Sequence, residues 1–571
     1  MERQSYWWRL QKARMSRRRL IQAAGIATAG VAGAALIGCG GDEEGAPGAG
    51  SPVAGAAETA MTPVADEGTP QYGGHIVTGT RDIVSSLDPT LCVEITCLTI
   101  GDNFHGYLYS VDRRDNSYDA QMAESMEQPD DLTYIWKLRP GIKFHNVDPT
   151  WGREVTAEDV VYSFTRRRDD PTTQADKQLL RDYTDSFEAT DKYTFRFVTT
   201  RPYVPAIEEL SNQTYAIVPR EAVEKWGDLT QHPVGCGAYI LDDFVVGERV
   251  KMVKNPDFYM DGLPYIDSRE IQVIPDEGTI TQAFETKRHD VYSGGEPHPR
   301  KVERWLKIDG VVVRKYWNYW RRTFMLKVDK PPFNDIRVRK AIDLALDRQD
   351  FMDKMWFGEG RIAGPVVPDL EPFSLPQEEV DAFYKLDLAE AKAALAAAGY
   401  ENGLDVELSV QNVADLSKYA EIAKEHLAKV GVNARLTLQE LGVYLAQTLY
   451  PGNFQMTCFY NLPYEEPDRP LCQWFSKGQA GISFSGYNNP EADEWIWKER
   501  SEFDFDKRVA IIHDAQRFFM KEHGPQISTH TDQGYVAFWN WHHGWDSYRK
   551  GNRGRGYFTG LGVTDWLTER T

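Results

Sequence analysis

Five cysteines in the body of the chain have a spacing that could support disulfide or metal chemistry. Cys92 and Cys97 are close enough in sequence to pair, and so are Cys458 and Cys472, whereas Cys236 is left over. Outside the cytoplasm such pairs can form disulfides. A C-x4-C pattern without a second matching pair is weak support for zinc. We therefore expect disulfides or buried thiols at these positions, and no metal site.

The other reactive side chains do not form a catalytic pattern. The 12 histidines show no i, i+4 pair on a predicted helix, so a transition-metal site has no support. The sequence contains no G-x-S-x-G, H-E-x-x-H or phosphate-loop motif. Acids are plentiful, and paired carboxylates suffice for glycoside cleavage, so an exported α/β hydrolase acting on glycosides or similar solutes stays open as the alternative. No catalytic residue and no cofactor are predicted.

Composition limits the class of partner. The chain has 85 acidic and 65 basic residues and a net charge of −20, which argues against sequence-independent nucleic-acid binding. Beyond residue 70, about 500 residues remain, enough for two to four domains. No apolar run in this part approaches the length of a membrane-spanning helix, so a soluble body is expected.

The sixth cysteine, Cys39, lies between an apolar segment and a glycine-rich one. Residues 1–19 are strongly basic and residues 20–38 are uncharged and rich in Ala and Gly, which is the layout of an export signal. Residues 16–22, which include Arg17 and Arg18, resemble the twin-arginine export motif, although Leu20 and Gln22 depart from it and leave Sec export open. Residues 36–39 resemble the bacterial lipobox, in which the cysteine thiol receives a diacylglyceryl group.

These features predict an export signal at 1–38 and a lipidated Cys39 followed by a flexible linker to residue 70. The linker is dominated by Gly, Pro, Ala, Ser and acids, which cannot form a core. Two acyl chains give stable membrane anchoring, so the protein is expected outside the cytoplasm, anchored by lipid. Either Met1 or Met15 could be the true start.

The sequence pattern of the body predicts a mixed α/β fold without internal repeats. Strands are predicted at 75–80 and at 133–139, the second before the turn at Pro140-Gly141. A helix is expected to begin after Thr156, with acids in its first turn, and another spans 387–399. Strands at 404–410 and 433–438 flank a helix at 419–430, which predicts a β-α-β unit.

A series of short motifs runs through residues 73–490. They are the segments 73–74, 87–89, 122–126, 137–145, 156–164, 233–239, 247–250, 255–259, 274–277, 332–341, 345–348, 391–400 and 486–490. Together, and in this order, they resemble the family 5 extracellular solute-binding proteins of ABC transporters, the oligopeptide, dipeptide and nickel-binding group.

The resemblance implies a periplasmic-binding-protein-like type II α/β fold of the class C architecture, with two lobes that close by hinge motion and a small inserted third domain. Lobe I is then expected at 71–111, 190–315 and 530–571, the inserted domain at 112–189 and lobe II at 316–529. The implied partners are a small solute, the permease subunits of an ABC importer and, through its lipid, the membrane. The protein is expected to be a monomer. A role in feeding a sensor instead of a permease stays open.

The resemblance also points to a change in ligand chemistry. In peptide-binding relatives a segment of the form Trp-x-x-Asp-Tyr-x-x-Pro supplies an aspartate that pairs with the α-ammonium of the peptide. The matching residues here are 460–467, which place Tyr460 at the tryptophan and Pro463 at the aspartate. Glu465 or Glu466 could substitute from a shifted loop. The simpler hypothesis is a ligand that is not an ordinary free-amine peptide.

Aromatic residues make up 12% of the chain and cluster at 316–320 and 538–545. Such rings can stack on sugars or flat solutes, but most rings in a protein of this size belong to the core. By position in the family we expect ligand contacts at a limited set of residues, and the cluster at 538–545 is a weaker candidate. The expected contacts are Leu91, Val93, Glu94, Asn103, Phe104, Trp317, Tyr319, Tyr460, Asn461 and Glu465.

Overall fold

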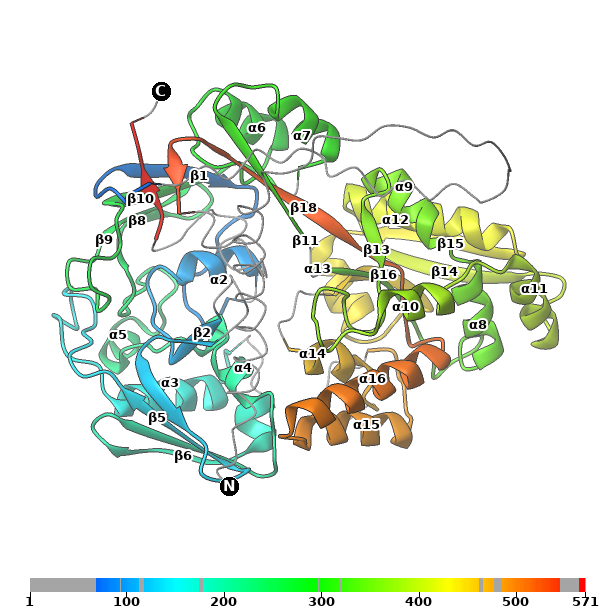
Figure 1. Cartoon of the computed structure of the whole chain (residues 1–571), viewed down its shortest axis with the longest axis horizontal. Helices are drawn as coiled ribbons and strands as arrows, with labels where there is room; N and C mark the ends of the chain where they lie inside the picture. Colours follow the sequence, from blue (N-terminus) through cyan, green and yellow to red (C-terminus); the bar gives the residue numbers. More distant parts are fainter. Residues whose placement is uncertain are drawn as a thin grey trace, which may run out of the picture.

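Figure 1 shows the computed structural model of the chain. The structure describes residues 68–92, 94–111, 118–173, 178–295, 297–317, 320–461, 466–476, 484–544 and 564–569. The predicted export signal and Cys39 lie outside these residues, as do Val93, Tyr319 and Glu465. Within the described ranges, none of the helices has the length and apolarity needed to cross a membrane.

Lobe I contains a four-stranded sheet in the order β1 (His75–Thr80), β10 (Ser268–Val273), β9 (Arg249–Lys254), β8 (Tyr239–Val245). Strand β1, which the sequence predicted, runs parallel to β10, and the other neighbours are antiparallel. The lobe also contains α2 (Ile95–Gly101), α4 (Ala206–Leu210), α5 (Arg220–Trp226), α6 (Glu277–Glu285) and α7 (Pro299–Trp305). Helix α2 packs on the sheet through Ile100, with Leu87, Met252 and Ile271 in the same core.

The inserted domain is a second antiparallel sheet covered by one long helix. Its strands follow the order β4 (Ala123–Glu127), β5 (Thr133–Leu138), β7 (Thr194–Thr199), β6 (Thr184–Asp191). Helix α3 (Ala157–Asp169) begins where predicted, with Thr156 as N-cap in a capping box with Asp159. Strand β7, which lies beyond the expected end of this domain at 189, is placed between β5 and β6 and hydrogen-bonds to both. Short strands β2 (Tyr109–Val111) and β3 (Tyr118–Ala120) pair across the expected boundary at 111.

Lobe II contains a five-stranded sheet in the order β15 (Val432–Gln439), β14 (Leu404–Gln411), β16 (Met456–Asn461), β12 (Arg321–Leu326), β17 (Gln526–Ser528). The predicted β-α-β unit is confirmed: β14 and β15 are parallel and α12 (Ala414–Ala428) connects them. Helix α11 (Leu388–Ala397) confirms the helix expected at 387–399, with Asp387 as N-cap. The remaining α-helices are α8 (Ile336–Ala345), α9 (Arg348–Trp356), α10 (Gln377–Phe383), α13 (Leu441–Val443), α14 (Asp468–Leu471), α15 (Pro490–Ser501) and α16 (Phe505–Lys521).

Two long strands connect the lobes. Strand β11 (Val311–Trp317) is antiparallel to β18 (His530–Trp539), and Figure 1 shows both crossing between the two halves of the molecule. The first residues of β18 pair with β13 (Gly360–Ile362) of lobe II, and the rest pair with β11. At this crossing Glu359 accepts a hydrogen bond from Tyr535 and forms an ion pair with Lys315 at 3.0 Å. The lobe boundaries expected near 315 and 530 fall on these strands.

The cysteines only partly follow the sequence prediction. Cys92 and Cys97 form a disulfide, with a Cα–Cα distance of 6.3 Å. The possible disulfide between Cys458 and Cys472 is not formed, and both are buried free thiols, the other expected state. They lie in different cores, Cys458 under the lobe II sheet and Cys472 among the helices beside it. The Cys472 Sγ donates to the backbone oxygen of Arg469 at 3.1 Å, and burial raises the pKa of this thiol to about 12.

The aromatic cluster at the end of β18 belongs to the core of lobe I. Trp539 and Trp541 are fully buried and stack with ring centroids 5.0 Å apart. The Trp541 indole N–H donates to Asp290 at 2.8 Å. His542 is also buried beside them, and the short strands β19 (His542–His543) and β20 (Trp566–Leu567) pair here. These rings therefore pack inside the lobe, in line with the low weight given to them as ligand contacts.

Candidate ligand-binding site

The edge of the lobe II sheet is where its topology would place a ligand. Strands β14 and β16 are parallel, so their carboxyl ends, Gln411 and Asn461, lie at the same edge. Strand β12 is antiparallel to β16 and begins at this edge, where Arg321 pairs with Asn461 and Arg322 with Tyr460. Ligands of open α/β sheets bind outside the carboxyl ends of the parallel strands. The predicted ligand loop at 460–467 therefore begins at the expected edge.

For the lobe II residues predicted to contact ligand, the strand pairing gives the position of the backbone. Tyr460 and Asn461 end β16, and Trp317 ends β11 opposite Gln533 of β18. Tyr319 and Glu465 lie outside the described residues. The backbone thus brings Trp317 to the crossing strands and Tyr460 to the carboxyl edge of the sheet.

Sequence reasoning missed a charged cluster at this edge, because its members are far apart in the chain. Arg322 is buried and forms ion pairs with Asp415 and Asp532, each at 3.2 Å. The Asp532 side chain is fully buried, and burial raises its pKa although Arg322 opposes this. The Asp415 side chain is 45% exposed and lies in the first turn of α12, next to the end of β14. The cluster thus joins β12, α12 and the interlobe strand β18.

Glu466, one of the two acids that could replace the missing aspartate, is paired within the protein in this structure. Its side chain is buried and forms an ion pair with Arg508 of α16. Arg508 also binds Glu499 of α15, with Nη2 to Oε2 at 2.6 Å. Burial raises the pKa of Glu466, and Arg508 opposes this. Glu466 thus holds the end of the ligand loop to the helices of lobe II.

On lobe I, the predicted contact Glu94 lies on the short loop that the Cys92–Cys97 disulfide closes, and the predicted contact Leu91 immediately precedes this loop. Leu91 is half-buried and Glu94 is exposed at the N-cap of α2. The Glu94 Oε2 lies 3.5 Å from the Cys97 Sγ. Cys92, Glu94 and Cys97 are close enough to form a metal site, but disulfide sulfurs are not thiolates, and the thiolate is the metal ligand. The disulfide therefore serves to fix this loop.

Asn103 and Phe104, also predicted as ligand contacts, support the lobe I fold in this structure. The Asn103 Nδ2 donates to the Ile100 backbone oxygen at 3.0 Å, and the Phe104 ring is fully buried in the lobe core. The Gly237 N–H donates to the Phe104 oxygen at 2.9 Å. A Cβ at either Gly235 or Gly237 would collide with the backbone there, which explains the two glycines of the motif at 233–239.

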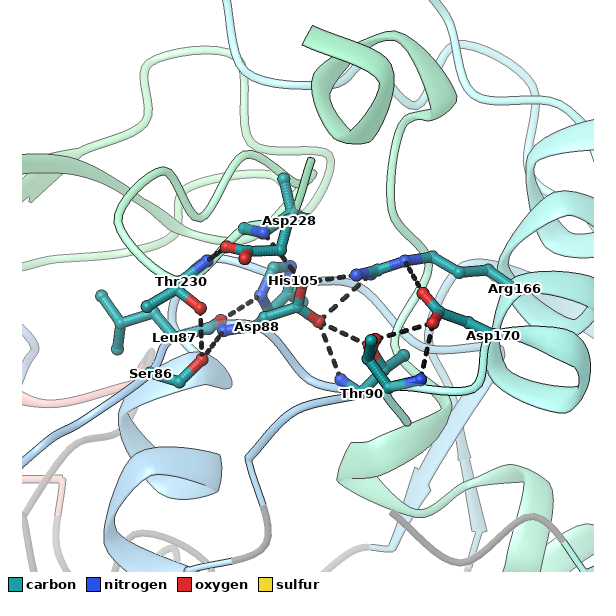
Figure 2. A network of polar contacts seen from close by, with 11 residues as sticks. Ser86, Leu87, Asp88, Thr90, His105, Arg166, Asp170, Asp228 and Thr230 are labelled. Atoms are coloured by element: carbon teal, nitrogen blue, oxygen red, sulfur yellow. Dashed lines mark hydrogen bonds and ion pairs between the residues drawn. The ribbon is translucent and has the colours of Figure 1, made fainter. Parts of the chain in front are cut away.

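Figure 2 shows the network around the Leu-Asp-Pro motif at 87–89. Asp88 is fully buried and accepts bonds from both terminal nitrogens of Arg166, with Oδ2 to Nη2 at 2.6 Å. It also accepts from the backbone N–H groups of Thr90 at 2.9 Å and Leu229 at 2.8 Å. Burial alone would raise the pKa of Asp88, but these bonds and the Arg166 charge hold it below its usual value. Because Arg166 belongs to α3, this pair fastens the inserted domain to lobe I.

A buried histidine completes the network. The His105 Nε2 lies 3.2 Å from the Leu87 backbone oxygen, and burial lowers the pKa of this imidazole to about 4. His105 is therefore neutral at physiological pH. The motif thus acts as a structural joint between domains, and none of its members resembles an activated catalytic group.

These features define a class of protein. Two α/β lobes are joined by crossing strands, their facing loops are held by buried ion pairs and a disulfide, and we find no nucleophile and base arranged for catalysis among the described residues. This is the organisation of a two-lobed solute-binding protein. The family of bacterial extracellular solute-binding proteins, family 5 middle, matches residues 117–481 of the 571, and the chain belongs to this family.

Relatives and solved structures agree with this assignment. Di/tripeptide-binding protein 2 of Pseudomonas aeruginosa (strain UCBPP-PA14) is 26% identical over 430 residues, covering 70% of this chain and 79% of the relative. The fold is similar to the periplasmic binding protein DppA of Helicobacter pylori in complex with the peptide STSA (TM-score 0.75, 24% identity, 87% of this chain and 99% of that one). It is equally similar to the binding protein AgaA of A. tumefaciens R10 in complex with agropinic acid (TM-score 0.76, 21% identity, 87% and 99%).

The family assignment settles the general role. Its members are binding proteins of transport systems and not enzymes, so this chain is a substrate-binding protein of an ABC transporter. The exported hydrolase has no support among the relatives. An extracytoplasmic location fits the family.

Proposed function

We propose that this protein captures a small organic solute that lacks the free α-ammonium group of an ordinary peptide, and delivers it to the permease of an ABC importer. The observation that carries the proposal is the chemistry of the loop after β16. The aspartate position of peptide-binding relatives is Pro463 in this chain, and Glu466 is buried against Arg508. An α-ammonium group in a closed cleft would lose its hydration without gaining the ion pair that an aspartate at position 463 would supply. Oligosaccharides, metal chelates and opine-like amino-acid conjugates do not need that pair.

A thermal-shift screen over di- to pentapeptides and these other solute classes tests the ligand class. A ligand present at 100 times its Kd stabilises the fold by about 2.7 kcal/mol, which raises the melting temperature measurably. We expect shifts with one of the other classes and none with free-amine peptides. Micromolar or tighter binding of the peptides would contradict the proposal, and recovery of chemically altered solute would support the hydrolase instead.

A substitution in the ligand loop sharpens the same test. Pro463→Asp restores the carboxylate of peptide-binding relatives and is expected to introduce affinity for free-amine peptides. Pro463→Asn has a similar shape without the charge, so it should not do so. Equal peptide binding by the two variants would show that charge at this position does not decide the ligand class.

We further propose that Cys39 carries the lipid that holds the protein at the membrane, with residues 40–70 as its tether. Cys39→Ala removes the thiol that would be acylated, so the variant is expected in the soluble fraction or as an unprocessed precursor. Cell fractionation and mass spectrometry of the amino terminus measure both outcomes. Unchanged membrane attachment of a mature Cys39→Ala protein would overturn the lipid anchor.

Arg17 and Arg18 support export by the twin-arginine route, which Arg17→Lys/Arg18→Lys should block.

A further inference from the structure

The lobes meet at a second place, away from the crossing strands. Figure 1 shows α15 and α16 of lobe II at the end of the molecule where β6 of the inserted domain lies, far from β11 and β18. Here the aromatic core of the inserted domain continues into the core of the lobe II helices as one cluster, which includes Tyr203, Val204 and Phe475. We call the residues around Arg500 the interlobe clasp: Tyr183, Tyr203, Phe475, Trp497 and Arg500.

Arg500 sits in an aromatic cage contributed by both sides. Its guanidinium carbon lies 5.6 Å from the ring centroid of Tyr183 and 5.3 Å from that of Tyr203, both from the inserted-domain side. It lies 4.7 Å from the ring of Phe475 and 5.3 Å from that of Trp497, both of lobe II. Cation–π attraction is strongest when the cation is desolvated, and the Arg500 side chain is only 3% exposed.

Directional bonds cross the same boundary. The Arg500 Nη1 donates to the Tyr183 hydroxyl at 3.2 Å. The Val204 N–H donates to the Arg500 backbone oxygen at 2.7 Å. At the rim, the guanidinium of Arg201 lies 4.3 Å from the Trp497 ring centroid. The contact between the lobes is therefore specific as well as apolar.

The clasp is tied to the end of the ligand loop. Arg500 binds Asp468 through both Nε and Nη2, the latter at 3.0 Å from Oδ2. The preceding residue, Glu499, shares Arg508 with Glu466. Arg500 thus holds Asp468 directly, and its neighbour Glu499 is linked to Glu466 through Arg508. Separation of the lobes would therefore disturb the side chain that holds Asp468.

We propose that Arg500 and its cage are positioning residues that favour the closed arrangement of the two lobes. The inference rests on the proposed function only in that lobe closure retains the solute. In the closed arrangement the clasp holds the inserted domain against lobe II, and its loss shifts the molecules toward an open arrangement. The apparent affinity for a solute depends on the fraction of molecules in the binding-competent arrangement, so the clasp sets that affinity without contacting solute.

Spin labels on either side of the clasp can measure closure without any ligand. Glu188→Cys in the inserted domain and Glu494→Cys on α15 are exposed sites. The background carries Cys39→Ala, and the other native cysteines are buried or disulfide-bonded. We expect one short interlobe distance in the parent. Trp497→Ala should increase the open fraction about tenfold, since it removes the ring contact with Tyr183 and the ring over which both Arg500 and Arg201 lie. Arg201→Ala, at the exposed rim, should shift the distances the same way by less.

Trp495→Ala is the matched control. It removes an indole from the same helix, but its ring lies 4.8 Å from Lys498 of α15, and it should leave the interlobe distance unchanged. Distances in Trp497→Ala and Arg201→Ala that match Trp495→Ala, with the variants folded by melting temperature, would overturn the proposal. Because no solute enters this measurement, its failure would leave the proposed ligand class untouched, and an incorrect ligand class would leave this result standing.

Discussion

Asp88→Asn is expected to lower the free energy of unfolding by about 3–5 kcal/mol, because it breaks a buried ion pair and leaves Arg166 charged inside the protein. Each group that contacts the Asp88 carboxylate is a donor: Arg166, Thr90 and the Leu229 N–H. The side-chain amide nitrogen of asparagine is itself a donor, so it cannot accept the hydrogen bonds that these groups donate. Chemical denaturation followed by fluorescence and circular dichroism measures the loss.

The pH dependence of this variant provides an independent check. The folded pKa of Asp88 lies below its ordinary value, so its contribution is present above the unfolded pKa of about 3.9 and is lost as pH falls through the folded pKa. The difference between parent and variant should therefore be constant from pH 5 to 8 and shrink only under acid conditions. Glu188→Gln, which breaks the exposed pair with Arg196, is the control and should cost at most about 1 kcal/mol. A comparable loss in both variants would contradict a structural role for the joint.

Local sequence patterns predicted much of the fold because their causes are local. The cap at Thr156, the alternation at 75–80 and the helix between two strands at 404–438 each act within a few residues, and each matches the structure. The pairing of β7 with β5 and β6, beyond the expected boundary at 189, is determined by tertiary contacts that a local pattern does not contain. Similarly, Cys458 and Cys472 are near in sequence but face different cores.

The candidate site was less predictable for the same reason. Family position placed Tyr460 at the carboxyl edge of the sheet, but it could not show that Phe104 fills a core or that Glu466 is committed to Arg508. Arg322 and Asp532 meet although they are 210 positions apart. The signal that could have pointed to them is the presence of two arginines, Arg321 and Arg322, directly before the segment Thr-Phe-Met-Leu of a buried strand, since buried arginines need acceptors.

Arg508→Met is expected to be the second strongly destabilising change, again by about 3–5 kcal/mol near neutral pH. Arg508 is the shared partner of Glu466 and Glu499, and all three side chains are buried. Methionine has a similar length but no charge, so both carboxyl groups would lose their cation. Burial already raises the pKa of Glu466 and of Glu499, although Arg508 opposes this. Without Arg508 both pKa values should rise further.

The sign of the pH effect distinguishes this account from a simple packing defect. When folded carboxyl groups have pKa values above those of the unfolded chain, the folded state binds more protons, so stability falls as pH rises. The Arg508→Met protein should therefore be more stable at pH 5 than at pH 8 relative to the parent. Adding Glu499→Gln should recover part of the loss, because one of the two stranded carboxylates becomes neutral. A loss that is the same at both pH values and unaffected by Glu499→Gln would show that the charges of this cluster do not govern its stability.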